Sequence, residues 1–401
     1  MAAANGSELV GLAQAALVDD PGFLRGIVER AVQAMEMTAH LGAARYERGE
    51  GRTGSRNGSR PRTLKTRVGT LELRVPQDRD GTFSTELFGR YQRSEQALVV
   101  TLMEMYLHGV STRKVGEITE ALCGTSFSKS QVSALTGRLD ADLKAWRERP
   151  LGETSYPYLV VDARYEHVRV DGRVVSQGVL VVAGVREDGR RELLAVEVAD
   201  TESEATYHAL FRGLKDRGLR GVELVTSDDH AGLRAAIGRH FQGAAWQRCQ
   251  VHFARNLLGA VGAKHRARLG AELRGVFAAA GAAPAQAAAS ALAAAWRASH
   301  PKVAERVEEE IEDCFACYAF PAAHRPRLRT TNGLERLNQE LKRRTRVVRI
   351  FPHRDSLLRL VAALAMEQSE EWLSGRRYLD MEPLQEERPR TTAGADTPKA
   401  A

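Results

Sequence analysis

A change in hydrophobic period near Tyr156 constrains the fold of this 401-residue chain more than any other feature. From Ser94 to this point the apolar residues recur at helical spacing, and after it they recur at every second residue, which is the spacing of β-strands. The expected strands are Tyr158–Ala163, His167–Val170, Val174–Val185 and Glu192–Val198, with turns at Asp171-Gly172 and Glu187-Asp188-Gly189. The pattern therefore predicts a meander of antiparallel strands.

Helices and strands alternate after the meander. Thr201 and Glu204 have the spacing of a capping box, which predicts a helix that ends near Gly218. The elements expected next are a strand over Val222–Ser227, a helix from His230 to His240 and a short strand near Trp246. This order is typical of an α/β ribonuclease-H-like core, in which the first strand and the strand after the crossover helix lie adjacent and parallel.

Two acidic residues lie where these two strands end. Asp162 lies in the carboxyl-terminal half of the first strand, and Asp228 directly follows the second, so we expect both carboxylates at one mouth of the sheet. An Asp at the position of Asp162 could instead cap a turn, but the pattern there continues as a strand. Asp229 should point to the opposite face from Asp228. We therefore expect Asp228 to be the ligand, and Asp229 or His230 to cap the next helix or contact the substrate.

A third acidic residue, Glu335, lies near the start of a helix predicted from Gly333 to about Arg346. If Asn332 caps this helix, Glu335 occupies its third position and could be half of a capping box, so composition alone leaves both roles open. Many basic residues follow, and a solvated helix face would rarely crowd like charges in this way. The residues expected to line DNA on this helix are Arg336, Lys342, Arg343, Arg344 and Arg346.

Carboxylates gathered in one pocket repel one another, and divalent cations are the usual counter-charge. The net charge of +7 also favours a polyanionic partner, although many basic proteins bind no nucleic acid. We therefore expect Asp162, Asp228 and Glu335 to be catalytic and to hold two Mg²⁺ ions, with Mn²⁺ able to substitute. Such a site would displace an oxygen at phosphorus by using a water or a 3′-hydroxyl. His230 and Asn338 are expected to support it.

The region before Tyr156 is expected to bind DNA. Residues 1–44 show helical patterns such as Pro21–Leu41, residues 48–63 read as a flexible basic linker, and TRVGTLELRVP predicts a small hairpin or an edge strand. The residues expected to contact DNA in this region are Arg56, Arg60, Arg62, Lys65, Arg67, Arg113, Lys114, Lys129 and Gln131.

Three helices are predicted between Ser94 and Trp146. Gly109 ends the first, and Ser111 and Ser128 cap the second and third. This succession suits a helix-turn-helix in which the helix from Ser130 to Arg138 reads DNA. An ordinary three-helix bundle remains the alternative.

Four cysteines in a chain of this length indicate a reducing compartment without a disulfide framework. Cys249 and His252 form a C-x-x-H, and Cys314 and Cys317 form a C-x-x-C, which together could supply a zinc site. The second pair lies in a helical pattern where small core residues are commoner, so zinc stays the less favoured alternative. His252 is expected to support the active site by hydrogen bonding.

No signal peptide or membrane span is expected. The first twenty residues lack a basic start and an apolar core, and the alanine-rich run Gly275–Trp296 predicts helices in water. We therefore expect a cytoplasmic protein without a membrane partner.

These patterns divide the chain into six expected regions. They are an amino-terminal helical and basic DNA-binding region (1–93), a helix-turn-helix-like domain (94–150), the first part of the ribonuclease-H-like core (151–252), an all-helical insertion (253–326), the last part of the core with the Glu335 helix (327–378) and a disordered tail (379–401).

Four segments resemble the Mutator-type transposases of bacterial insertion sequences: RNGSRPRTLKTRVGTLELRVPQDRDGTF, YLHGVSTRKVGEITEALCG, VVDARYEHVR with TSDDHAGL, and RTTNGLERLNQELKRRTRVVRIFP. The resemblance covers roughly residues 45–375, and the last segment is the most specific. One departure is Asp229, where a small residue is usual in the family.

The resemblance implies a DDE transposase whose ribonuclease-H-like core is interrupted by a helical insertion. The family triad falls on Asp162, Asp228 and Glu335, and its C-x-x-H signature falls on Cys249 and His252. It also implies Mg²⁺-dependent cutting and joining of double-stranded DNA at terminal inverted repeats and target sites, by a homodimer or larger assembly associated with the nucleoid. The alternatives are a transposase-derived DNA-binding protein without catalysis and a metal-dependent nuclease that does not join strands.

Overall fold

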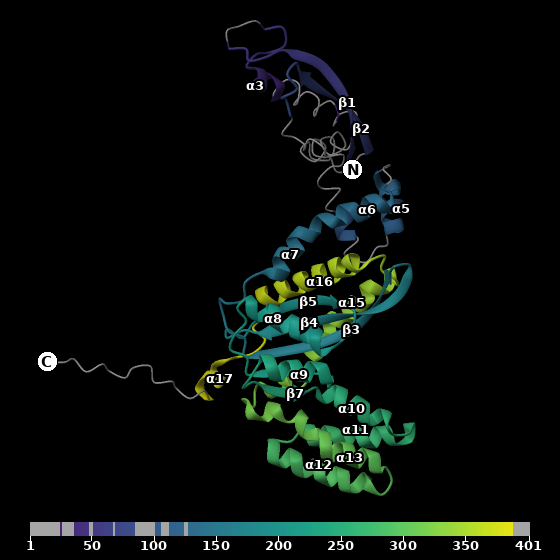
Figure 1. Cartoon of the computed structure of the whole chain (residues 1–401), viewed down its shortest axis with the longest axis vertical. Coiled ribbons are helices and arrows are strands. Elements are labelled where there is room, and N and C mark those ends of the chain that lie inside the picture. Colours follow the sequence, from purple (N-terminus) through teal and green to yellow (C-terminus); the bar gives the residue numbers. More distant parts are fainter. Residues whose placement is uncertain are drawn as a thin grey trace, which may run out of the picture. The chain divides into compact units, whose positions relative to one another are not determined.

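The computed structural model describes residues 25, 36–47, 51–66, 69–84, 101–105, 112–123 and 127–387 (Figure 1). The chain divides into two compact units, residues 1–138 and residues 139–401. The predicted helix Pro21–Leu41 lies mostly outside the described residues, and its last part forms α3 (Met37–Leu41).

The first unit contains a hairpin of β1 (Arg56–Thr66) and β2 (Gly69–Asp78). The strands pair antiparallel and bury Leu64, Leu71, Leu73 and Val75. The segment TRVGTLELRVP, predicted as a small hairpin or an edge strand, supplies mainly one strand, β2. The partner strand comes from residues 56–66, so the flexible linker predicted for residues 48–63 is wrong over residues 56–63. Most of these residues are polar and exposed, so their extended conformation depends on pairing with β2 and leaves little trace in the sequence.

The helices α5 (Thr112–Cys123) and α6 (Lys129–Thr136) contact each other in the first unit. Their core consists of Leu102, Val115, Phe127 and Val132. Gly116 is needed where α5 meets the following turn, because an added Cβ would lie 2.7 Å from the Phe127 carbonyl oxygen. This packing fits both the helix-turn-helix and the three-helix-bundle alternatives. The predicted boundaries at Gly109 and Ser111 lie outside the described residues.

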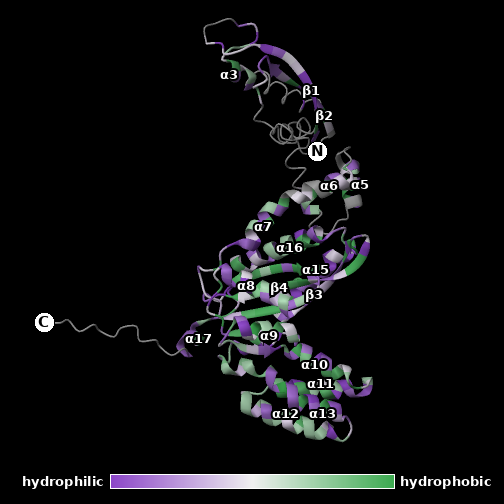
Figure 2. Ribbon diagram, in the orientation of Figure 1, coloured by the Kyte–Doolittle hydropathy of each residue, from purple (hydrophilic) through white to green (hydrophobic). Residues whose placement is uncertain are grey.

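The second unit is built on a mixed five-stranded sheet. In sheet order its strands are β5 (Arg191–Ala199), β4 (Arg173–Val185), β3 (Tyr158–Val170), β6 (Leu224–Ser227) and β7 (Ala245–Arg248). The first three form the expected antiparallel meander, and β6 and β7 run parallel to β3. The two segments predicted as separate strands at 158–163 and 167–170 are one long strand. Figure 2 shows that the strands of this sheet carry long hydrophobic stretches.

Helices cover both faces of this sheet. Those next to it are α7 (Asp140–Glu148), α8 (Glu204–Asp216), α9 (Ala231–His240), α15 (Asn332–Val348) and α16 (Arg354–Ser374). Val161 of β3 packs in the core that α8 and α9 cover, whereas the next residue, Asp162, contacts α15. Because successive residues of a strand point to opposite faces, α15 lies on the face opposite α8 and α9.

Two boundaries differ from the predictions. The helix α8 is capped by Ser203, whose Oγ accepts from the Thr206 amide at 3.2 Å, so the capping box predicted at Thr201 is wrong. The first unit ends at Arg138 and not at residue 150, because α7 is tied to the second unit by charged pairs. Those pairs are Asp140 with Arg359 of α16 and Arg147 with Glu197 of β5.

The all-helical insertion is present as expected. Its helices are α10 (Gln250–Gly259), α11 (Ala263–Phe277), α12 (Ala282–Arg297) and α13 (Pro301–Glu310), followed by the 3₁₀ segments η3 (Ile311–Cys314) and η4 (Ala316–Ala319) and by α14 (Arg325–Leu328). They share a separate core that includes Phe253, Leu273 and Trp296. Across the described part of the chain, every helix is too short or too polar to cross a membrane.

The beginning of the predicted tail is ordered. Residues Glu382–Glu387 form α17, and Leu379, Met381 and Leu384 are buried beside Tyr158. The prediction of disorder is therefore wrong for residues 379–387, because three spaced apolar side chains anchor a segment of otherwise polar composition. Residues 388–401 lie outside the described residues.

Candidate active site

The sheet brings Asp162 and Asp228 together. Tyr158 of β3 pairs with Leu224 of β6 in parallel register, and each acidic residue comes four positions after one member of this pair. Both side chains therefore lie at the same end and on the same face of the sheet. The predicted adjacency of the two strands is confirmed, while the roles of the two residues stay predictions.

The electrostatics of Asp162 fit a cation site. Burial raises the pKa of Asp162 to about 6, the Asp228 carboxylate adds to this shift, and His252 and Asn338 oppose it. Asn338 Nδ2 donates to Asp162 Oδ2 at 2.5 Å, whereas Asn338 Oδ1 is buried without a hydrogen-bond partner among the described residues. Two neighbouring carboxylates and an unpaired amide oxygen are the oxygen ligands that Mg²⁺ prefers.

Asp229 points away from this site, as its alternation with Asp228 predicts. Its carboxylate pairs at 3.0 Å with Arg248, whose side chain is only 2% exposed and also pairs with Glu310 of α13 at 2.8 Å. The sequence around Arg248 gives no sign of this role, because its partners are distant along the chain. The pairs connect the segment that carries Asp228 to the helical insertion. His230 caps α9 by accepting from the Leu233 amide, as one of the two alternatives predicts.

Glu335 lies in the first turn of α15 with an exposed side chain. The helix begins at Asn332 with Thr331 as its N-cap and without a side-chain capping bond, so the capping-box alternative for Glu335 does not form. Asn338 lies one helical turn after Glu335 and reaches Asp162. Glu335 therefore lies on the side of α15 nearest Asp162 and Asp228, which are called the sheet pair below. Among the described residues, however, no three His, Cys, Asp or Glu side chains lie close enough to hold one metal ion.

The C-x-x-H pair lies beside Asp228. His252 Nδ1 is 3.9 Å from Asp228 Oδ1, and Cys249 Sγ accepts from the Thr331 amide at 3.4 Å. Burial acts to raise the pKa of the Cys249 thiol, but hydrogen bonds from His252 and Thr331 outweigh it and lower that pKa. Cys249 in turn raises the pKa of His252, and Asp228 and Asp162 add to this effect. The pair therefore lies next to the carboxylates and contacts Thr331, the N-cap of α15.

The other two cysteines are buried in two different cores. Cys314 belongs to the core of the insertion, and Cys317 packs near Tyr158. Burial raises the pKa of Cys317 to about 11 and raises that of Cys314 as well. Protonated thiols in separate apolar cores are poor metal ligands, which favours the core-residue interpretation of the C-x-x-C.

Comparison with known proteins identifies the family. A family model described as "Transposase, Mutator family" matches residues 4–375. The chain belongs to the Mutator family of transposases.

Curated relatives of this Mutator-family transposase cover most of its length. It is 51% identical over 373 residues to the transposase for insertion sequence element ISRM5 of Rhizobium meliloti, which covers 92% of this chain and 94% of the relative. It is 46% identical over 364 residues to the transposase for IS406 of Burkholderia multivorans, covering 90% and 93%. It is 42% identical over 350 residues to the transposase for IS256 in transposon Tn4001 of Staphylococcus aureus, covering 86% and 90%.

A solved structure, the Drosophila P element transposase strand transfer complex, is a structural match that covers 75% of this chain and 83% of the matched chain. The sequence identity is 8% and the TM-score is 0.30, a level that carries no information about the fold.

The basic residues of α15 in this Mutator-family transposase divide into two groups. Arg336, Lys342, Arg343 and Arg346 are exposed, as expected for a surface that lines DNA. Arg344 departs from the prediction, because its side chain is buried and donates to Glu340 at 2.6 Å. Arg343 also binds Glu340 and, together with Arg344, lowers the pKa of Glu340 to about 2.

The basic residues predicted to contact DNA in the first unit also differ in environment. Arg60 and Lys114 are exposed, Arg62 is half-buried, Arg56 donates to Thr38 and Ala43, and Lys65 lies 4.6 Å from the centre of the Phe127 ring. Gln131 serves mainly as a cap: its amide donates to Ser128 Oγ at 3.2 Å and its side chain accepts from the Ser128 amide at 2.9 Å. Arg67 and the side chains of Arg113 and Lys129 lie outside the described residues.

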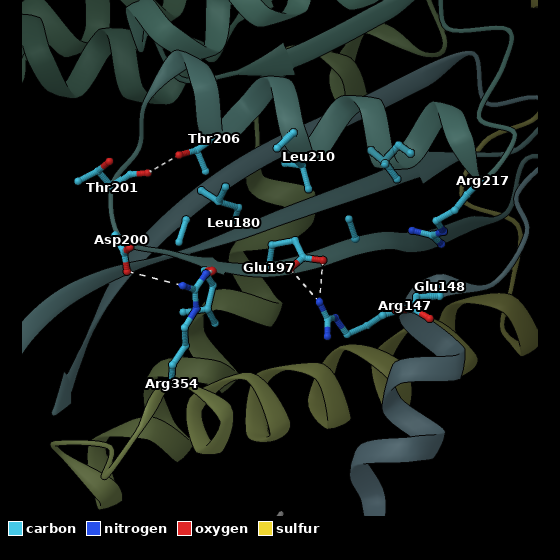
Figure 3. A pocket seen from close by; sticks show the side chains of 16 residues that line it. Arg147, Glu148, Leu180, Glu197, Asp200, Thr201, Thr206, Leu210, Arg217 and Arg354 are labelled. Atoms are coloured by element: carbon cyan, nitrogen blue, oxygen red, sulfur yellow. Dashed lines mark hydrogen bonds and ion pairs between the residues drawn. The ribbon is translucent and has the colours of Figure 1, made fainter. Parts of the chain in front are cut away.

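A hollow of about 570 Å³ lies along β5, the edge strand of the sheet (Figure 3). Three arginines that line it donate to carbonyl oxygens of β5: Arg147 to Val196, Arg217 to Leu194 and Arg354 to Val198. These bonds use carbonyl oxygens on the outer edge of β5, which another strand could otherwise pair with. Asp162, Asp228 and Glu335 do not line this hollow, so it is separate from the candidate active site.

Proposed function

We propose that this protein is a DDE-type transposase that binds the terminal inverted repeats of an insertion sequence and cleaves and joins DNA. The observation that carries the proposal is the pair of carboxylates, Asp162 and Asp228, on one face of two parallel neighbouring strands. The strand order, with an antiparallel meander followed by two parallel strands, supports a ribonuclease-H-like core. Membership of a transposase family supports DNA as the substrate.

In this proposal Asp162 and Asp228 hold two Mg²⁺ ions, for which Mn²⁺ can substitute. When bound, these ions would supply positive charge that favours loss of a proton by a water or a 3′-hydroxyl and stabilises the leaving oxygen. Asn338 orients Asp162 through its hydrogen bond, and the His252 ring, 3.9 Å from Asp228, acts to lower the pKa of Asp162. The exposed cations of α15, Arg336 and Lys342 among them, neutralise the phosphates of the bound strand.

We propose further that Glu335 completes the site only on DNA, in a homodimer or larger assembly. Its carboxylate is exposed and has no hydrogen bond or ion pair to a described residue, so α15 can deliver it without breaking a contact of that side chain. Terminal repeats and target DNA would then supply the interactions that hold α15 in its catalytic position.

The test incubates the protein with labelled duplexes made from the DNA that flanks its coding region, with and without Mg²⁺. Joined products that require Mg²⁺ are expected. Nicks without joined products would identify a nuclease, and a mobility shift without cleavage would identify a DNA-binding protein that has lost catalysis. If about six phosphates are neutralised, the logarithm of the binding constant should fall against the logarithm of salt concentration with a slope of roughly −5.

A further inference from the structure

The β3–β4 hairpin extends well beyond the sheet. The pairing of β3 with β6 covers only Tyr158–Val160, and the pairing of β4 with β5 begins at Gly178. The two strands nevertheless continue to pair with each other as far as Val170 and Arg173. In the described part of the chain, the distal half of this hairpin is therefore a two-stranded ribbon, supported at its side by Phe351.

The end of this ribbon carries apolar and cationic side chains on both faces. Val170 is directly opposite Arg173, and Arg169 is directly opposite Val174, so each face presents one valine beside one arginine. Val170 and Val174 are 38% and 47% exposed, so a large apolar side chain is exposed on each face of the projecting tip. Among the described residues, the Arg169 side chain makes one hydrogen bond, of 3.5 Å, to the Gly172 carbonyl oxygen of its own turn.

A strained turn adds another cation at the side of the ribbon. Arg349 has φ +63° and ψ −55°, and the Ile350 amide donates to the Val348 carbonyl oxygen at 2.8 Å, which makes Arg349 the centre of a tight three-residue turn. This conformation is rare for a residue with a side chain. It is enforced by Phe351, two residues after Arg349, which is buried and exchanges hydrogen bonds with β3. The turn leaves Arg349 and Ile350 exposed.

We propose that the tip of the β3–β4 hairpin, with the Arg349 turn beside it, enters a groove of the duplex DNA that the active site cleaves. The proposal rests on the proposed function. Arginines on both faces of the ribbon match a groove that has a phosphate backbone on each side, whereas a flat protein partner would meet only one face. A two-stranded ribbon fits the major groove, which is about 12 Å wide, and the exposed valines can contact sugars and thymine methyl groups there. Strained backbone conformations cluster at functional sites, and here the strained residue presents an exposed cation.

The geometry also predicts where the contact falls. Val170 comes eight residues after Asp162 on the same strand, which corresponds to about 26 Å at 3.3 Å per residue. This length spans roughly 8 base pairs of duplex at 3.4 Å each. The hairpin should therefore protect DNA at about this distance from the scissile phosphate.

The test compares two double variants of equal charge in the full-length protein. Arg169→Gln with Arg173→Gln removes the cations of the tip, and Arg239→Gln with Arg274→Gln removes two exposed cations from α9 and α11. Binding to a labelled duplex of element-end DNA is measured over a range of salt concentrations without Mg²⁺, together with a hydroxyl-radical footprint. The tip variant should reduce the magnitude of the salt slope by about 2 and lose the protection at about 8 base pairs from the cut, and the control should do neither.

A second variant separates DNA from a protein partner at the same tip. Val170→Ser with Val174→Ser should weaken DNA binding several-fold without changing the salt slope or the mass of the protein in sedimentation. A change from a larger assembly to a monomer, with DNA binding intact, would overturn the proposal in favour of a second copy of the chain. Equal slopes and footprints for the tip and control variants would also overturn it. A wild-type protein that binds the duplex but never cleaves it would refute the proposed function and leave this binding test valid.

Discussion

The two parts of the candidate active site are held in place by different interactions. Asp162 and Asp228 belong to the sheet, where backbone hydrogen bonds between β3 and β6 fix their relative positions. Glu335 belongs to α15, whose position against β3 depends on side-chain contacts such as those of Asn338 with Asp162 and Thr345 with Glu166. The relative position of Asp162 and Asp228 is therefore fixed by the sheet itself, whereas that of Glu335 depends on the packing of α15, which buries Leu334, Leu337 and Leu341.

This difference predicts that metal binding depends on the sheet alone, whereas catalysis also depends on α15. The sheet pair has neighbouring carboxylates and a raised pKa at Asp162, so it can attract a cation in the absence of DNA. The helix contributes an exposed carboxylate that lies outside any group of three potential ligands among the described residues. We expect the first cation to bind to the sheet pair, and Glu335 to act only after DNA has repositioned α15.

The largest expected effect is the loss of DNA cleavage when an acidic residue of the sheet, Asp162, or of α15, Glu335, is replaced. Asp162→Asn and Glu335→Gln should each reduce DNA cleavage by at least about a thousandfold, because a lost metal ligand removes several kcal/mol of transition-state stabilisation. Calorimetric titration of the DNA-free protein with Mg²⁺ should distinguish them: Asp162→Asn loses the heat of binding and Glu335→Gln keeps it. Both variants should still bind element-end DNA. Equal loss of Mg²⁺ binding in the two variants would show that the third carboxylate already belongs to the site.

The second prediction concerns the buried Arg248, which connects the segment of Asp228 to the helical insertion. Arg248→Ala should lower the free energy of unfolding by about 2 kcal/mol, because it removes the buried partner of Asp229 and Glu310, both partly exposed, while Glu310 keeps its pair with Arg306. Arg234→Ala is the matched control, since Arg234 pairs with Asp313 at an exposed position and should contribute at most about 1 kcal/mol. Urea titration followed by circular dichroism measures both. Similar values for the two variants would mean that Arg248 does not tie the Asp228 segment to the insertion.

The third prediction concerns the contact between helix and sheet. Asn338→Ala removes the hydrogen bond to Asp162 and should weaken Mg²⁺ affinity of the DNA-free protein by about 10–100-fold, the usual effect of losing a residue that orients a ligand. Asn256→Ala, at an exposed position of α10, should leave the affinity unchanged. If Asn338→Ala reduced cleavage on DNA without changing metal affinity, Asn338 would act on the position of α15 and not on Asp162.

Much of the sheet side could be predicted from the sequence, because its determinants are local. Alternating apolar residues define β3 and β4, and the parallel pairing of β3 with β6 follows from the order of strands and helices. The opposite orientations of Asp228 and Asp229 follow from strand geometry alone. The cap of α9 by His230 is also a local property.

The features that could not be predicted depend on partners distant in the chain. Arg248 is buried because Asp229 and Glu310 surround it, and its sequence neighbours give no sign of this. Arg344 lies in the same basic run as Arg343, yet only the packing of α15 shows that one is buried and the other exposed. The ordered segment at Leu384 owes its conformation to a core centred on Tyr158. Composition reports none of these contacts.

The smallest predicted effect is a dependence of metal binding on pH. Burial raises the pKa of Asp162 to about 6, so protons compete with Mg²⁺ for this carboxylate below that pH. The affinity of the DNA-free protein should be constant above about pH 7 and should fall by up to about tenfold per pH unit below pH 6. The free energy of unfolding changes with pH in the opposite direction to the Mg²⁺ affinity. The folded protein holds the Asp162 proton more tightly than the unfolded chain, so the contribution of Asp162 to stability is present at low pH and is lost as the pH rises through about 6. Titration of Glu335→Gln should give the same pH profile as wild type if the sheet pair binds the cation alone, and a profile shifted toward lower affinity at every pH would show that the helix takes part.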